Sequence, residues 1–156
     1  MFSISANVKF LNHILHKSLS DNLIGQFDQA LQFYQESIED NQSQFGMGET
    51  LLKLGRYKDA ANHLQPLFDN PAVTLPEVGP LLARAHLLSG ALDQAESVVN
   101  LALKDEAHPH TIKLLATQGL VHYFRGNLSP AQEALEKSYQ LGISVKSSPL
   151  VEEELD

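Results

Sequence analysis

Gly25-Gln26-Phe27-Asp28-Gln29-Ala30 recurs in three related stretches, Gly55-Arg56-Tyr57-Lys58-Asp59-Ala60, Gly90-Ala91-Leu92-Asp93-Gln94-Ala95 and Gly126-Asn127-Leu128-Ser129-Pro130-Ala131. Each stretch follows the pattern Gly-x-apolar-x-x-Ala, and the four glycines lie 30, 35 and 36 residues apart. A sequence period of this length is typical of a solenoid, in which each repeat packs only on its neighbours. The chain of 156 residues is therefore expected to form one domain of stacked repeats.

Apolar residues recur at helical spacing on both sides of these glycines. In the first copy, the residues at one such face are Phe27, Ala30, Leu31, Tyr34 and Ile38. Their spacing of three and four residues builds one apolar stripe on a helix. The same reasoning predicts helices near 12–23 and 27–39 in the first copy, and near 111–124 and 128–141 in the fourth. The predicted fold class is all-α, built from helix hairpins.

The boundaries of individual helices are also predicted. Gly55, just past a helix, suits the left-handed conformation that ends helices, so it is expected to form a hairpin corner. Pro66 lacks a backbone donor and predicts a kink or early fraying in the next helix. The third copy has two candidate starts: a capping box from Thr74 to Glu77, or Gly79 as a cap before Pro80.

The copies resemble the tetratricopeptide repeat, whose pattern places a small residue in the first helix and an alanine in the second. The matching residues are Met47-Gly48, Leu51, Ala60, Leu64 and Pro71 in the second copy, Leu82-Ala83, His86, Ala95 and Val99 in the third, and Gln118-Gly119, His122, Ala131 and Leu135 in the fourth. Only Ala30 and Tyr34 match in the first copy. The resemblance thus covers residues 12–141, as three clear repeats and one degenerate N-terminal repeat.

This resemblance implies a right-handed superhelix, an α-solenoid, of about four antiparallel helix hairpins. A single tetratricopeptide domain would span residues 1–156, with 1–11 as an N-terminal arm or helix and 142–156 as an acidic C-terminal tail. Small residues would allow close helix packing, because larger side chains there cost about 1–3 kcal/mol. The positions assigned to close packing are Ala30, Gly48, Ala60, Ala83, Ala95, Gly119 and Ala131. The other structural repeat positions, Gly25, Gly55, Gly90 and Gly126, belong to the hairpin corners.

In the tetratricopeptide family, the first helices of successive repeats line a concave groove that holds an extended or helical peptide. The residues that the resemblance assigns to this groove are Leu15, Leu19, Phe45, Glu49, Leu52, Glu77, Arg84, Leu87, Lys113, Ala116, Leu120 and Tyr123. Some family members bind acidic C-termini through a clamp of basic residues and asparagine. Arg84 and Lys113 are the only basic residues of the set, so this clamp is not expected. An apolar groove edged by charges suits an amphipathic partner.

Composition narrows the classes of partner. The formal net charge is −8, and four of the last five residues are acidic. Such a charge opposes nonspecific binding to nucleic acid, because phosphate binding requires clustered lysine and arginine. There is no run of about 20 apolar residues that would predict membrane insertion. The beginning of the sequence lacks the pattern of a secretory signal, and the chain has no cysteine, so a cytoplasmic location is expected.

Seven histidines raise the question of a metal site. His13 and His16 are spaced as two ligands on one helical face, but no third ligand completes a recognised set. His86 and His122 occupy equivalent repeat positions, where packing is expected, and the loop residues His108 and His110 are expected to be solvated. The chain also lacks a Gly-x-Ser-x-Gly elbow and a glycine-rich phosphate loop. Neither enzyme activity nor a cofactor or metal is expected.

The sequence therefore predicts a noncatalytic scaffold or adaptor that binds a protein or peptide, without nucleic acid as a partner. One alternative is a dedicated cytoplasmic chaperone for a secreted or assembly-prone client, since small acidic tetratricopeptide proteins act in this way. A second alternative is a metal-binding or accessory subunit of an enzyme. An array end without a polar cap also leaves a homodimer through that end as an alternative.

Overall fold

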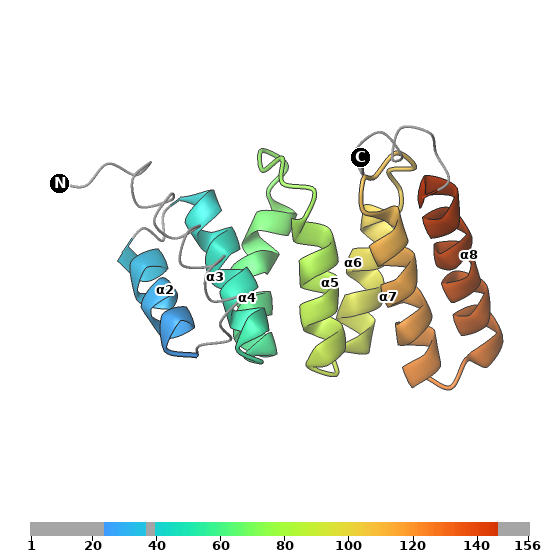
Figure 1. Cartoon of the computed structure of the whole chain (residues 1–156), viewed down its shortest axis with the longest axis horizontal. Helices are drawn as coiled ribbons and strands as arrows, with labels where there is room; N and C mark the ends of the chain where they lie inside the picture. The colour runs from blue at the N-terminus through green and yellow to red at the C-terminus, as the bar shows by residue number, and fades with distance from the viewer. Residues whose placement is uncertain (1–23, 37–39, 147–156) are drawn as a thin grey trace. The chain divides into compact units, whose positions relative to one another are not determined.

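The computed structural model describes residues 24–36 and 40–146, and all regular structure in these residues is helical (Figure 1). The helices are α2 (Ile24–Glu36), α3 (Asn41–Lys53), α4 (Tyr57–Asp69), α5 (Val78–Leu88), α6 (Leu92–Ala102), α7 (Thr111–Phe124) and α8 (Leu128–Lys146). They belong to two compact units, residues 1–74 and 75–156. The predicted all-α class is confirmed, whereas the predicted arm 1–11 and helix 12–23 lie outside the described residues.

In the first unit, α3 and α4 form a hairpin and α2 packs on α3. Asp40 begins α3 by accepting a hydrogen bond of 3.2 Å from the backbone N–H of Ser43, which satisfies one of the free donors at a helix start. The ring of Tyr34 lies against Gly46, where a Cβ atom would collide with it. Sequence reasoning did not single out Gly46, because this glycine lies outside the repeat pattern.

The second unit contains two hairpins, α5 with α6 and α7 with α8, and α7 packs on both helices of the preceding hairpin. Leu82, Val99, Leu114 and Val121 are almost completely buried between these helices. Helices α5, α6 and α7 thus each pack on their hairpin partner and on the neighbouring hairpin, whereas α8 packs mainly on α7.

Three helix corners have the same backbone geometry. Gly55, Gly90 and Gly126 have φ angles of 77°, 80° and 80°, in the left-handed region that glycine adopts without a Cβ clash. At each corner, the glycine N–H donates to the carbonyl three residues earlier, at 3.1, 3.1 and 2.9 Å. The next N–H donates to the carbonyl five residues earlier, at 2.9, 2.8 and 2.9 Å. These two bonds define a Schellman motif, so the repeated glycines are repeated helix stops.

Gly25 differs from the other three glycines, because it lies within α2 and not between two helices. The first copy of the pattern therefore does not form a corner of the same kind. The helix begins one residue before Gly25 and ends at Glu36, while residues 37–39, including the predicted stripe residue Ile38, lie outside the described residues.

The structure changes some of the other predicted helix boundaries. Helix α5 begins at Val78, with Pro80 as its third residue, and Glu77 makes no side-chain cap bond. Neither predicted start is therefore correct, although Gly79 and Pro80 lie in the first turn, where a missing N–H is tolerated. Helix α4 continues past Pro66 to Asp69. Helix α7 matches its predicted bounds, whereas α8 runs through Gly142 to Lys146, beyond the predicted start of the tail.

Two of the predicted close-packing glycines lie directly against a leucine of the facing helix. A Cβ atom on Gly48 would lie 2.5 Å from Cγ of Leu64, and one on Gly119 would lie 2.5 Å from Cγ of Leu135. The facing alanines are also enclosed. The alanine positions that the sequence assigned to packing, Ala30, Ala60, Ala83, Ala95 and Ala131, are all at most 3% exposed. Small residues at these positions let the backbones approach, as predicted.

Candidate functional site

The predicted groove residues of the first unit are only partly accessible. Leu15 and Leu19 lie outside the described residues, and Phe45, Glu49 and Leu52 are half-buried. Burial and, to a smaller extent, the nearby Glu49 carboxylate raise the pKa of Tyr34 to about 12. Glu49 itself pairs with Lys53 one turn later, at 3.3 Å. The described groove residues of the first unit therefore pack against other residues of the unit and leave little surface for a ligand.

The second unit presents four of the predicted groove residues on two adjacent helices. Glu77 and Arg84 lie seven residues apart at the start and middle of α5, and Lys113 and Leu120 lie seven residues apart on α7. All four are exposed, and we call them the first-helix face. Nε2 of His110, at the start of α7, lies 3.8 Å from Oε1 of Glu77, so the beginnings of the two helices are close together. Ala116, also predicted for the groove, is half-buried.

Leu87 does not belong to an exposed surface. It is 8% exposed and forms a core cluster with Ala95 and Val121, against which Leu92 also packs. Val121 comes from α7, so Leu87 contributes to the packing of one hairpin on the next. Leu87 is therefore a buried packing residue of the second unit and offers no exposed surface to a ligand.

Tyr123 occupies the position in the fourth copy that Leu87 occupies in the third, 36 residues earlier. Unlike Leu87, Tyr123 is 57% exposed. It helps to line a groove of about 570 Å³ on α7 and α8, whose other lining residues are Leu128, Ala131, Gln132, Leu135, Glu136 and Tyr139. We call this surface the end face. Leu128 and Tyr139 are 64% and 66% exposed, so the end face presents large apolar side chains to solvent.

The equivalent surface of the third copy is covered by α7. The apolar end-face residues Tyr123, Leu128, Ala131, Leu135 and Tyr139 correspond to Leu87, Leu92, Ala95, Val99 and Leu103. All five equivalents in the third copy are buried or half-buried. The described chain therefore contains the same helix surface in two forms, one covered by the next helix and one exposed.

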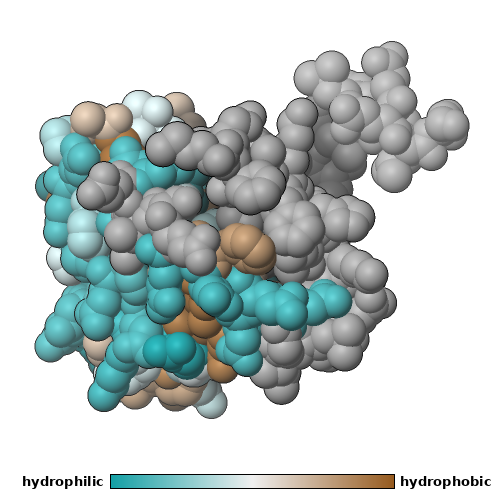
Figure 2. Space-filling view, turned by 90° about the vertical axis from the view of Figure 1, so that its left-hand side faces the viewer, coloured by the Kyte–Doolittle hydropathy of each residue, from teal (hydrophilic) through white to brown (hydrophobic). Residues whose placement is uncertain are grey.

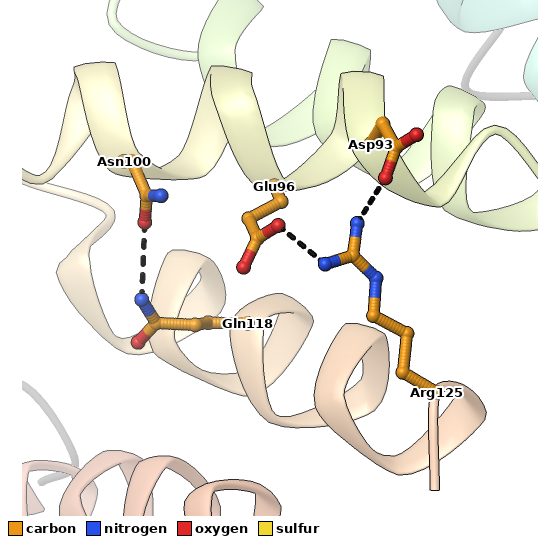
Figure 3. A network of polar contacts seen from close by, with 5 residues as sticks. All are labelled: Asp93, Glu96, Asn100, Gln118 and Arg125. Atoms are coloured by element: carbon orange, nitrogen blue, oxygen red, sulfur yellow. Dashed lines mark hydrogen bonds and ion pairs between the residues drawn. The ribbon is translucent and has the colours of Figure 1, made fainter. Parts of the chain in front are cut away.

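Polar side chains hold α7 on the third copy (Figure 3). Arg125 donates from Nη1 to Glu96 at 2.7 Å and from Nη2 to Asp93, and Gln118 donates from Nε2 to Asn100 at 3.2 Å. Sequence reasoning missed these residues, because Arg125 lies in the turn and its two acidic partners are 29 and 32 residues away. A basic residue after a helix and an acidic pair at the start of the preceding helix were the only available signals.

The first unit offers a smaller hollow of about 150 Å³, lined in part by Leu31, Met47 and Leu51. At its edge, Arg56 donates to Asp59 at 2.9 Å, so these two charges pair with each other. On the side shown in Figure 2, the described surface is largely hydrophilic, with hydrophobic residues near its centre and at its upper and lower edges. This hollow is less suited to a large partner than the end face.

The histidines do not assemble a metal centre in residues 24–36 and 40–146, where no group of three metal-ligating side chains occurs. His13 and His16 lie outside these residues. Burial lowers the pKa of His86, and Nδ1 of His122 is buried without a hydrogen-bond partner, in agreement with packing roles for both rings. The loop residue His110 was expected to be solvated, but its side chain is only 22% exposed.

No protein-family model matches the chain, and no curated protein matches its sequence. Within the part of the chain that the structure describes, no helix has the length and apolar character needed to cross a membrane.

Proposed function

We propose that this chain is a noncatalytic protein-interaction scaffold of the cytoplasm, related in architecture to tetratricopeptide proteins and arranged as a right-handed superhelix of about four hairpins. The Schellman corners at Gly55, Gly90 and Gly126 support a repeated hairpin unit, because the same two hydrogen bonds recur at each. The close packing of Gly48 with Leu64 and of Gly119 with Leu135 supports a common register within these hairpins.

The observation that carries the binding role is the first-helix face. Glu77 and Arg84 on α5, with Lys113 and Leu120 on α7, form two equivalent pairs on neighbouring helices, and all four are exposed. A face that carries an exposed leucine and exposed charges of both signs suits a peptide or helix with apolar and charged residues. The proposed ligand is therefore an amphipathic segment of another protein.

A charge and an apolar contact of this face can be removed together. We expect Arg84→Glu with Leu120→Ser to abolish capture of the partner by the tagged full chain from the native host, measured by quantitative mass spectrometry. The matched control is Lys104→Glu with Leu101→Ser, since both residues are exposed and lie outside the face. Capture that is equal for the two variants would contradict the proposal.

The same experiment addresses the chaperone alternative. A dedicated chaperone is expected to retain one client at a fixed ratio, whereas a scaffold of broader use is expected to retain several proteins. In either case, the loss must be specific to the variant of the first-helix face.

A further inference from the structure

We propose that the end face binds an amphipathic helix of another protein that carries a basic residue opposite Glu136. This inference goes beyond the first-helix face, because it concerns a different surface made by α7 and α8. The inference rests on a comparison of the third and fourth copies. In the third copy, α7 covers the surface that is equivalent to the end face.

The apolar part of the surface is retained between the two copies. In the covered form, Val121 of α7 packs against Leu87 and Ala95. In the exposed form, the equivalent positions hold Tyr123 and Ala131, both of which line the groove. An aliphatic residue at the position of Val121 in an incoming helix would therefore meet a larger apolar surface than it does in the third copy.

The polar residues of the surface differ between the third and fourth copies. This difference indicates which charges a bound helix should carry. Asp93 and Glu96, which bind Arg125, are replaced at the equivalent positions by Ser129 and Gln132. The negative charge moves to Glu136. This residue is equivalent to Asn100, which accepts the hydrogen bond from Gln118 in the third copy.

An incoming helix placed like α7 would therefore carry its basic residue at the position of Gln118. That position lies three residues before the Val121 position, and seven before the Arg125 position, where no cation is required. A lysine or arginine there has the reach to pair with the exposed Glu136 carboxylate. The expected ligand has a basic residue, an aliphatic residue three positions later, and a neutral residue seven positions later.

Charge disfavours two occupants that this chain itself could supply, a second copy of the face and residues 147–156. The residues that line the end face include Glu136 but no lysine or arginine, so a second copy of the face offers no opposite charge. Residues 147–156 contain four acidic residues and no basic residue, so they do not complement Glu136 either. A basic helix from another protein satisfies both the apolar and the charged part of the surface.

The test uses the full chain and a fluorescent, end-blocked helical peptide with lysine at the Gln118 position. The peptide has aliphatic residues four before and three after the lysine, and glutamine seven after it. The matched peptide has glutamine in place of lysine. Fluorescence anisotropy is expected to show binding about three- to fivefold tighter for the lysine peptide, the size of a partly exposed ion pair. In Glu136→Gln this preference is expected to disappear.

The apolar contacts are tested with Tyr123→Ser and Leu128→Ser together, which should weaken binding at least about tenfold. The control variant is Leu88→Ser with Leu101→Ser, because both residues are exposed and neither lines the end face. Circular dichroism checks that helix content is retained. If the Tyr123 and Leu128 variant unfolds, hydrogen exchange of the unaltered chain decides: peptide-dependent protection of 128–139 supports the proposal, and protection elsewhere overturns it.

Several results would overturn the inference. One is a lysine preference that survives in Glu136→Gln. Another is a dimer of the unaltered chain that Tyr139→Ser converts to monomer, because a second copy would then occupy the face. A third is binding only after deletion of 147–156, which would identify this segment as the occupant. None of these results affects the pull-down on the first-helix face, so the two proposals fail separately.

Discussion

Leu64 packs on Gly48 so closely that a Cβ atom on the glycine would lie 2.5 Å from the leucine Cγ. The contact joins α3 to α4, and the contact between Leu135 and Gly119 joins α7 to α8 in the same way. A leucine on the second helix therefore reaches the backbone of the first. This relationship explains why the repeat pattern needs a small residue in the first helix.

We predict that Gly48→Ala lowers the free energy of unfolding by about 1–3 kcal/mol, because the added methyl group overpacks a fully buried leucine. Urea unfolding followed by circular dichroism measures the change. Gly142→Ala is the control, since Gly142 lies within α8 and a Cβ there meets nothing within 4 Å. The control is expected to be stabilising by about 0.5–1 kcal/mol. Equal effects of the two substitutions would refute the packing argument.

At Gly90, the effect of backbone strain on stability can be measured without an effect of packing. Its φ angle is 80° and a Cβ atom would meet no other atom within 4 Å. Gly90→Ala is therefore expected to cost about 1–2 kcal/mol through the left-handed conformation alone. Gly90→Asn should cost less, because asparagine tolerates this conformation. Thermal unfolding of both variants tests the order, and an asparagine variant no more stable than the alanine variant would contradict it.

Arg125 joins two hairpins, whereas Arg56 pairs with Asp59 only three residues away. Arg125→Gln is expected to lower stability by about 1 kcal/mol, chiefly through Glu96, because the Glu96 side chain is 29% exposed and that of Asp93 is 93% exposed. Arg56→Gln should change stability by less than about 0.5 kcal/mol. A double-mutant cycle of Arg125→Gln with Glu96→Gln gives the coupling, which should decrease at high salt. A coupling near zero would assign Arg125 no role in holding α7.

We expect His86 to make the free energy of unfolding depend on pH. Burial lowers its pKa in the folded state below 6.5, so the unfolded chain binds the proton more readily. Above about pH 6.5 the ring is neutral in both states and the free energy of unfolding is at its full value. As the pH falls below that value, the unfolded chain takes up the proton first and the free energy of unfolding decreases. Leu51 occupies the equivalent position in the second copy, which makes His86→Leu the natural comparison. Between pH 5 and 7.5 the unfolding free energy of this variant should depend less on pH than that of the unaltered chain; an identical slope would exclude His86 as the cause.

Local chemistry made much of the hairpin geometry predictable. The glycine at each of the three corners can be read from the sequence, because a left-handed residue after an apolar helix has few alternatives to glycine. The bounds of α7 also follow from periodicity alone. The start of α5 was not predictable, because Thr74, Gly79 and Pro80 offer competing signals and the helix begins at a different residue, Val78.

The candidate sites were only partly predictable for a related reason. Exposure of Arg84, Lys113 and Leu120 follows from the phase of the repeat. The burial of Leu87 and the exposure of Tyr123 do not follow from the repeat phase. The two residues occupy the same repeat position and differ in whether another helix covers them. The packing role of Gly46 was missed for the same reason. Its contact with Tyr34 joins α3 to α2, which is not its hairpin partner.

The sequence by itself determined the all-α class, the repeat period, the three glycine corners and the small residues at helix crossings, because these depend on backbone conformation and on contacts within one repeat. The tertiary structure decided which equivalent positions are covered. Covering depends on the next helix in space, as Val121 shows when it buries Leu87. The Arg125 pairs with Asp93 and Glu96 were likewise decided by packing, because charges about 30 residues apart meet only when two hairpins are placed side by side.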